Sequence, residues 1–244
     1  MKIGIIGAGN IGSTLARKLA ACGHEVKLAN SKGPESIQAL ANEIGVHAVT
    51  KEEAVSGVEV VILSIPFANY PDLEPIMSKV PEKTVVIDTS NYYPGRDGVI
   101  KEVDDGLPES IWVSKRIGHP VIKAWNAVLA ATLADKGQPA ESPTRIALPV
   151  AGGDTYAEAI AQDLVEDTGF TALAAGSLED SWRQQPGTPA YCTELTLPEL
   201  KLALQMADKE RAPKNRDALL AKFMAPGSQL THEQIVATNR AMTA

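Results

Sequence analysis

The chain opens with a short apolar segment that runs directly into three closely spaced glycines. The segment 2–6 reads Lys-Ile-Gly-Ile-Ile, and Gly7, Gly9 and Gly12 follow it at the start of a stretch with helical periodicity. Gly7 permits a tight turn, Gly9 leaves the backbone open to a pyrophosphate, and Gly12 allows close packing of helix on strand. The helix start also turns its N–H groups and positive dipole end toward phosphates. This order predicts the first βαβ unit of a dinucleotide-binding fold.

Short runs rich in Val and Ile alternate with helical segments along most of the chain, which is typical of a doubly wound, mostly parallel α/β sheet. Strands are expected at 2–6, 25–29, 46–49, 58–64, 84–87, 117–124, 145–150 and 170–174. Three capping boxes predict helix starts, pairing Thr50 with Glu53, Thr155 with Glu158 and Thr231 with Gln234. The fold class is therefore Rossmann-like α/β with a helical C-terminal extension.

The strand-like pattern stops near residue 176. A polar, turn-rich loop begins at Ser177, and the remaining segments show only helical spacing. We expect an NADP-binding domain at 1–176 and an extension at 177–244. Because 68 residues are few for a separate core, the extension is expected to pack on the domain or on a partner subunit, and a homodimer is one possibility.

The residues after the second expected strand indicate which dinucleotide binds. An NAD-preferring protein usually has a carboxylate there, about 20 residues past the glycines, to accept hydrogen bonds from the ribose hydroxyls. This chain has Asn30, Ser31 and Lys32 instead. A hydroxyl donor and a cation suit a 2′-phosphate, so we expect NADP(H); the alternative is that Lys32 is a solvated loop lysine.

The other strand ends are also candidate sites, because ligands of doubly wound sheets bind at the carboxyl ends of the strands. The candidate cofactor-binding residues are Gly7, Gly9, Asn10, Ile11, Gly12, Asn30, Ser31, Lys32, Ser64, Ile65, Pro66, Asp88 and Asn91, and the candidate catalytic residues are Lys123, Asn126 and His119. For each group beyond the second strand, a plain turn or a buried structural hydrogen bond is the alternative. His119 is the one histidine near an expected site and a weak candidate acid or base.

Composition excludes several partners. The net charge of −7 gives no long-range attraction to nucleic acid or anionic lipid, and no apolar run is long enough to span a bilayer. Cys22 and Cys192 stand in no metal-ligand spacing, and no metal cluster is evident. The chain reaches its first strand with no room for a secretion signal, so a cytoplasmic location is expected.

Several of these segments together resemble a known family. They are residues 7–12, 30–32, 64–66, 88–91, 121–126 and 150–154, within about the first 176 residues. The chain resembles the NADPH-dependent deazaflavin (8-hydroxy-5-deazaflavin) reductase-like proteins, and is similar to the oxidoreductase domain of the six-transmembrane epithelial antigen of prostate metalloreductases. The loop at 181–191 and the helical tail differ from the short ending of the archaeal deazaflavin enzymes, which leaves the electron acceptor open.

The resemblance implies hydride transfer between NADP(H) and a flavin or deazaflavin ring stacked on the nicotinamide. Ser31 and Lys32 would hold the 2′-phosphate, and Pro66 would border the nicotinamide. Asn91, Lys123 and Asn126 would line the reacting face. A ring acceptor delocalises charge and needs little proton transfer, which agrees with the lack of a recognisable acid–base motif in the sequence.

Two other hypotheses remain. The first is an NADPH-dependent reductase of a small carbonyl or imine, with Lys123 or His119 as proton donor. The second is a non-catalytic NADPH sensor whose helical tail binds a partner. The leading hypothesis is an oxidoreductase with a small-molecule electron acceptor, the second ring being expected near Asn91, Lys123 and the loop of Trp182 and Arg183.

Overall fold

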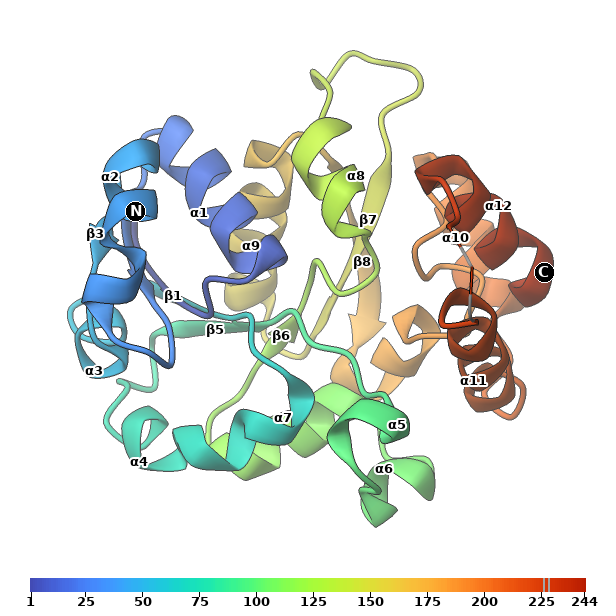
Figure 1. The fold of residues 1–244 in the computed structure, drawn as a ribbon, viewed down its shortest axis with the longest axis horizontal. Coiled ribbons are helices and arrows are strands. Elements are labelled where there is room, and N and C mark those ends of the chain that lie inside the picture. The colour runs from blue at the N-terminus through green and yellow to red at the C-terminus, as the bar shows by residue number, and fades with distance from the viewer. Residues whose placement is uncertain (226, 228) are drawn as a thin grey trace.

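A single eight-stranded sheet organises the protein in the computed structural model, which describes residues 1–225, 227 and 229–244 (Figure 1). The strands are β1 (Lys2–Ile6), β2 (Glu25–Ala29), β3 (His47–Ala48), β4 (Val60–Leu63), β5 (Val85–Asp88), β6 (Ile122–Lys123), β7 (Ala147–Gly152) and β8 (Thr171–Ser177). Their order in the sheet is β3-β2-β1-β4-β5-β6-β7-β8. This is the doubly wound order, extended by two strands at one side.

The direction of the strands decides where ligands can bind. The first six strands are parallel, whereas β7 runs antiparallel to β6 and β8 runs parallel to β7. The carboxyl ends of β1 to β6 therefore share one edge of the sheet, and those of β7 and β8 lie at the opposite edge. The strand order reverses between β1 and β4, so a ligand crevice is expected there.

Helices cover both faces of the sheet, and Figure 1 shows α1, α8 and α9 on one side and α4 and α7 on the other. The helices are α1 (Asn10–Ala21), α2 (Gln38–Ile44), α3 (Lys51–Ala54), α4 (Glu74–Met77), α5 (Pro94–Asp97), α6 (Lys101–Asp104), α7 (Glu109–Ile117), α8 (Ala130–Asp135), α9 (Thr155–Asp167), α10 (Leu197–Met206), α11 (Ala212–Phe223) and α12 (His232–Thr243), with short 3-10 helices η1 (Pro34–Ile37), η2 (Phe67–Leu73) and η3 (Leu178–Gln184).

Successive side chains of each strand contribute in turn to two apolar cores, one on each face of the sheet. In β4, Val60 and Ile62 join the core formed with α1 and α9, while Val61 and Leu63 join the core formed with η2 and α7. Successive side chains of a strand point to opposite faces, so a fully apolar strand is buried on both sides. This explains why the strands read as short continuous runs of Val, Ile and Leu.

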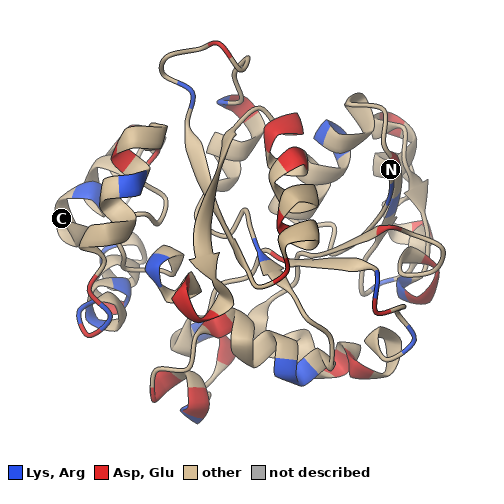
Figure 2. Cartoon of the chain, turned by 180° about the vertical axis from the view of Figure 1, so that it is seen from behind, with Lys and Arg blue, Asp and Glu red and all other residues tan. Residues whose placement is uncertain are grey.

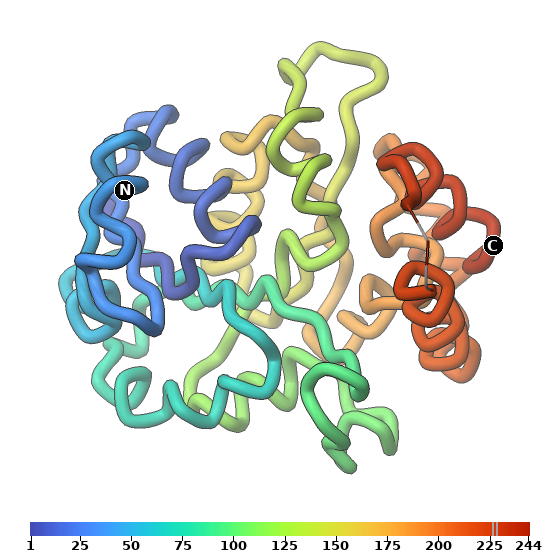
Figure 3. Tube along the Cα trace, in the orientation of Figure 1, coloured from blue at the N-terminus to red at the C-terminus, as the bar shows by residue number. Residues whose placement is uncertain are grey.

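The C-terminal helices lie beside β7 and β8, at the far end of the sheet from α2 and α3 (Figure 3). Leu200 and Leu204 of α10 pack with Ala147 and Ala190 in a separate small core. From α12, Arg240 donates hydrogen bonds to the carbonyl oxygens of Thr193 and Glu194, at 2.6 and 2.7 Å. The extension therefore packs on the strands of its own chain.

Two expected elements differ from the structure. The strand expected at 117–124 is only β6, because α7 continues to Ile117 and ends at Gly118, whose φ of 66° lies in the left-handed region. The box of Thr155 and Glu158 is also wrong. Asp154 caps α9 instead, its side chain accepting a hydrogen bond from the Ala157 N–H.

The other two capping boxes are confirmed. In the pairs Thr50–Glu53 and Thr231–Gln234, the threonine side chain accepts a hydrogen bond from the backbone N–H of its partner, and the partner side chain accepts one from the threonine N–H. Acidic and basic residues are interspersed over the outer helices and loops rather than gathered by sign (Figure 2). Within the described ranges, no helix has both the length and the apolar character needed to cross a membrane.

Candidate functional site

The glycine loop joins β1 to α1, and contacts with neighbouring backbone explain two of its glycines. A Cβ on Gly7, whose φ is 115°, would lie 1.9 Å from the Ser64 carbonyl oxygen. A Cβ on Gly12 would lie 1.8 Å from the Gly7 carbonyl oxygen. Both positions therefore exclude any larger residue. A Cβ on Gly9, by contrast, meets no other described atom within 4 Å, so Gly9 faces open space.

That open space belongs to a pocket of about 320 Å³ at the carboxyl ends of β1, β2 and β4. Seven of the predicted cofactor residues line it: Gly7, Gly9, Asn30, Ser31, Ser64, Ile65 and Pro66. Helix α1 begins beside it at Asn10, with Gly9 as its N-cap and no acidic residue in its first turn. The first N–H groups of a helix have no intrahelical acceptor, so the pocket offers donors to a pyrophosphate.

The other residues of the glycine loop serve the fold. Ile11 is half-buried and packs on the core beneath α1, and Gly12 is buried.

At the end of β2, the Asn30 side chain accepts a hydrogen bond from the Lys32 N–H at 3.0 Å and donates one to Ser36 at 2.7 Å. Asn30 thereby shapes the turn that presents Ser31. Lys32 is exposed and does not line the pocket, whereas Lys51 of α3 does.

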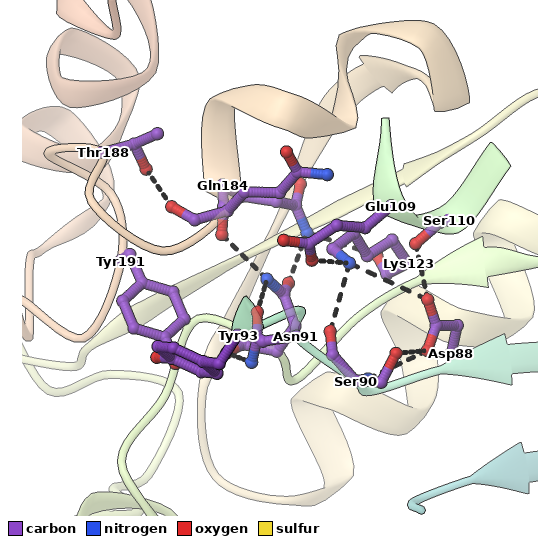
Figure 4. Close-up of polar contacts among 12 residues, drawn as sticks. Asp88, Ser90, Asn91, Tyr93, Glu109, Ser110, Lys123, Gln184, Thr188 and Tyr191 are labelled. Carbon is purple, nitrogen blue, oxygen red and sulfur yellow. Dashed lines mark hydrogen bonds and ion pairs between the residues drawn. The ribbon is translucent and has the colours of Figure 1, made fainter. Parts of the chain in front are cut away.

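A buried charged cluster occupies the ends of β5 and β6 (Figure 4). Lys123 has no exposed surface, and its Nζ lies 3.3 Å from Glu109 Oε2 and 3.7 Å from Asp88 Oδ2. It also donates a hydrogen bond to the Ser90 carbonyl oxygen, at 3.2 Å. A buried ammonium needs such partners, because an unpaired charge inside a protein is very unfavourable. The Lys123 side chain is therefore enclosed by its partners, although it lies at the expected strand end.

The carboxylates of this cluster differ in their environments. Asp88 accepts hydrogen bonds from the Tyr70 hydroxyl, the Ser90 N–H and hydroxyl, and the Ser110 hydroxyl, at 2.6 to 2.9 Å. Burial raises the pKa of Glu109, and the neighbouring Lys123 opposes part of that effect. Asp88 is wholly buried and does not line the 320 Å³ pocket, so its position differs from the predicted cofactor contact.

A chain of amide side chains lies next to this cluster. Asn126 donates hydrogen bonds to Asn91 Oδ1 at 3.0 Å and to the Gln184 carbonyl oxygen at 2.8 Å. Gln184 in turn donates to Asn126 Oδ1 at 2.9 Å. The structure thus brings Asn91, Lys123 and Asn126 together, as the sequence predicts, and adds Gln184. The backbone nearby is constrained, since Trp125 has a φ of 54°.

Beyond the amides, an apolar pocket of about 220 Å³ lies between the strand ends and the C-terminal helices. Tyr93 and Tyr191 line it, and their hydroxyl groups are hydrogen-bonded at 2.9 Å. Burial raises the pKa of both tyrosines above its usual range, so both remain protonated at neutral pH. Leu219 and Phe223 of α11 form part of the opposite wall.

His119 is not part of this edge. It precedes β6, and it lines a pocket of about 570 Å³ with Thr84, at the amino end of β5, and Asp154, at the start of α9. That pocket lies at the edge of the sheet opposite the glycine loop. His119 Nδ1 is 2.9 Å from the Pro120 carbonyl oxygen. The expectation that His119 lies near the cofactor is therefore wrong, because a residue before a parallel strand is at the wrong edge.

Sequence reasoning missed Lys51, Glu109, Gln184 and the tyrosine pair. The sequence contains a signal for Lys51, which follows an expected strand and lies between Thr50 and Glu53 of a predicted capping box, and for the loop at 181–191, which contains Gln184 and Tyr191. Gln184 contacts a residue 58 positions away, and Tyr191 one 98 positions away. Contacts of that separation depend on how the loop after β8 folds over the sheet.

Comparisons with known proteins agree with this geometry. The protein YjhV of Escherichia coli (strain K12) is 38% identical over 104 residues, which are 43% of this chain and 76% of YjhV. The crystal structure of the hypothetical protein SMa0349 from Sinorhizobium meliloti is 30% identical with a TM-score of 0.69, over 80% of this chain and 95% of that one. The chain belongs to the family of these two proteins.

Residues 2–92 match the sequence model of the family described as NADP oxidoreductase, coenzyme F420-dependent. This part contains the glycine loop, the end of β2 and the wall of the 320 Å³ pocket. This N-terminal part is therefore similar to that of NADP-dependent oxidoreductases. A candidate F420-dependent NADP reductase from Arthrobacter sp. FB24 has the same fold, with 21% identity and a TM-score of 0.61 over 73% of this chain and 86% of that one.

Proposed function

We propose that the protein transfers hydride between NADP(H) and a flavin or 8-hydroxy-5-deazaflavin ring. The 320 Å³ pocket carries this proposal, since it joins an open glycine backbone, a helix N-terminus and the end of β2 at the point where the strand order reverses. The description of the matching family, which names coenzyme F420, supports a deazaflavin as acceptor.

The residues present fit an NADP molecule. Gly9 and the first turn of α1 would hold the pyrophosphate. Ser31 would bind the 2′-phosphate, with the positive charge of Lys32 beside it, as no carboxylate follows β2 within residues 30–34. Pro66 would border the nicotinamide, which supplies or accepts the hydride when bound. The role of this chain is to fix the two reactants in contact and to exclude water.

The ends of β5 and β6 support a ring acceptor. Lys123 is enclosed by carboxylates, and Asn91 and Asn126 bond each other, so these three side chains are poorly placed to deliver a proton. The neighbouring 220 Å³ pocket has mostly apolar walls, which suit a planar ring. We place the acceptor there rather than near Trp182, whose ring is covered by Arg183 at 4.5 Å.

Stopped-flow spectroscopy tests the proposal. Protein and NADPH are mixed with FAD, FMN or a deazaflavin, and rapid bleaching of one ring with NADPH oxidation is the expected result. NADPH oxidation with none of the three would contradict the ring acceptor. A Lys32→Glu variant should shift the cofactor preference from NADPH toward NADH, because the new carboxylate repels a 2′-phosphate and accepts hydrogen bonds from a ribose.

One observation favours a second candidate, the reduction of a small carbonyl or imine. The Tyr93–Tyr191 hydroxyl pair lies in the apolar pocket and stays protonated, so it could donate a proton where Lys123 and His119 cannot. Turnover of such a substrate that falls at least about tenfold in Tyr191→Phe, with NADPH binding unchanged, would support this candidate. A Tyr156→Phe variant, at an exposed position of α9, is the matched control.

A further inference from the structure

Lys51 is the basic side chain that lines the pocket at the glycine loop. It shares the wall with Asn30 and Ser31, which follow β2. The lysine is half-buried, and among the described residues its ammonium group has no hydrogen bond or ion pair. A lysine held against a pocket without a counter-ion leaves its charge available to a ligand.

The sequence fixes Lys51 in this position through its neighbours. The capping box of Thr50 and Glu53 starts α3 at Lys51. Because β3 pairs with β2 in parallel, the residues that follow both strands share one edge of the sheet. Glu53 cannot neutralise Lys51 easily, since its carboxylate accepts hydrogen bonds from the Thr50 N–H and hydroxyl at 2.9 and 3.1 Å.

The charges around the pocket favour an anion near Lys51. Asp72, the one carboxylate in the lining of this pocket, belongs to η2, which follows β4. In the sheet β1 lies between β2 and β4. Asp72, which follows β4, and Lys51, which follows β3, therefore come from strands on opposite sides of the glycine loop. Within the described part of the chain, Asp72 and Lys51 form no ion pair. Two lysines therefore follow neighbouring strands at this edge: Lys51, after β3, lines the pocket, and Lys32, after β2, is exposed and does not line it.

We infer that Lys51 is a specificity-determining residue that pairs with the 2′-phosphate monoester on the adenosine ribose of NADP. The inference rests on the proposed use of NADP. A phosphate monoester carries up to two negative charges at neutral pH, and Ser31 with Lys51 can meet it from two strand ends. Lys51, at the pocket wall, supplies the contact, whereas Lys32 adds an exposed charge that salt screens.

Binding of two adenosine fragments by titration calorimetry tests this directly. The fragments are 2′,5′-ADP, which has the phosphate in question, and 5′-AMP, which lacks it. Lys51→Met keeps most of the side-chain stem and removes the charge. We expect it to weaken 2′,5′-ADP binding roughly tenfold or more, as for loss of a charge-assisted contact, while 5′-AMP binding stays within about twofold.

Two further variants complete the experiment. Lys51→Arg should restore most of the preference, because a guanidinium also binds phosphate. Lys115→Met, at an exposed position of α7, should leave both affinities unchanged. Circular dichroism of each variant confirms folding.

The outcomes separate the inference from the proposal beneath it. If the native protein binds both fragments equally, the assignment of NADP fails. If the native protein prefers 2′,5′-ADP and Lys51→Met keeps that preference, only the inference fails. Equal weakening of both fragments by Lys51→Met would also overturn it, since the lysine would then contact the adenine or the 5′-phosphate.

Discussion

The two halves of the same sheet edge use their polar residues in opposite ways. At the ends of β1, β2 and β3, Gly9, Ser31 and Lys51 line a pocket. At the ends of β5 and β6, Asp88 and Lys123 are buried and satisfied by one another and by their neighbours. Identical topology has therefore produced an open binding surface on one side and a closed structural network on the other.

Segments outside the strands cause the difference by packing over one half of the edge. Helix α7 brings Glu109 and Ser110 over β5 and β6, and η3 brings Gln184 over the end of β6. Nothing comparable in the described chain covers Gly9. A polar residue at a strand end is thus a ligand contact only where no later segment covers it.

Removing the buried ammonium should have the largest effect. Lys123→Met leaves Glu109 and Asp88 together in the interior, so we expect the free energy of unfolding to fall by about 3–5 kcal/mol. Urea denaturation measures it, with Lys115→Met as the exposed control. Affinity for 2′,5′-ADP should be retained by the folded fraction. A fall below about 1 kcal/mol would mean that the network is not closed, and that Lys123 exchanges with solvent.

Glu109→Gln should have a smaller effect that depends on pH. The pKa of Glu109 is raised in the folded protein above its ordinary value of 4.5. Protonated Glu109 therefore contributes to the free energy of unfolding. This contribution is fully present below pH 4.5 and is lost as pH rises through the raised pKa. Glutamine does not titrate, so the variant should gain stability relative to the native protein as pH rises from 4.5 toward neutral.

Urea denaturation at a series of pH values measures this difference. Glu52→Gln, at an exposed position of α3, is the control and should give a difference that does not change with pH. If Glu109→Gln instead lost stability relative to the native protein as pH rises, the pKa of Glu109 would be lowered in the folded protein, because attraction to Lys123 would outweigh the effect of burial.

The glycine loop and most strands were predictable because their causes are local. Gly12 is required by the Gly7 carbonyl oxygen of the same loop, and β1 and β2 match their expected bounds. Asn30, Ser31 and Pro66 line the pocket because topology sets the ends of their strands side by side. Sequence periodicity contains that information.

The closed half, at the ends of β5 and β6, was not predictable because its contacts come from segments outside those strands. Whether Lys123 faces a ligand depends on Glu109, and nothing in the residues around Glu109 marks it as a buried partner. His119 was misplaced because a long expected strand hid the end of α7 at Ile117 and the turn at Gly118. Because β6 begins only at Ile122, His119 precedes the strand and lies at the opposite edge of the sheet.

The open half can be tested with a pair of glycine variants. Gly9→Ala adds a methyl group that meets no described atom within 4 Å but occupies the space of the pyrophosphate. We expect NADPH binding to weaken about tenfold or more, roughly 1.4 kcal/mol, without loss of stability. Gly12→Ala should reduce both, because its methyl group collides with the Gly7 carbonyl. Calorimetry measures the NADPH affinity and thermal unfolding measures the stability of each variant. Unchanged NADPH binding in Gly9→Ala would show that the pyrophosphate does not lie against Gly9.

The smallest effects should come from removing the same kind of cap beside the open pocket and in the C-terminal extension. Thr50→Ala and Thr231→Ala each lose the side-chain acceptor of a capping box, which costs about 1 kcal/mol. Their consequences should differ by position. Thr50→Ala loosens the start of α3 and should also weaken 2′,5′-ADP binding, since Lys51 follows it directly. Thr231→Ala should leave that affinity unchanged and instead speed hydrogen exchange in α12, whose Asn239 side chain donates to the Cys192 carbonyl oxygen. If both variants changed fragment binding equally, the open pocket would depend on the C-terminal helices and not on the start of α3 alone.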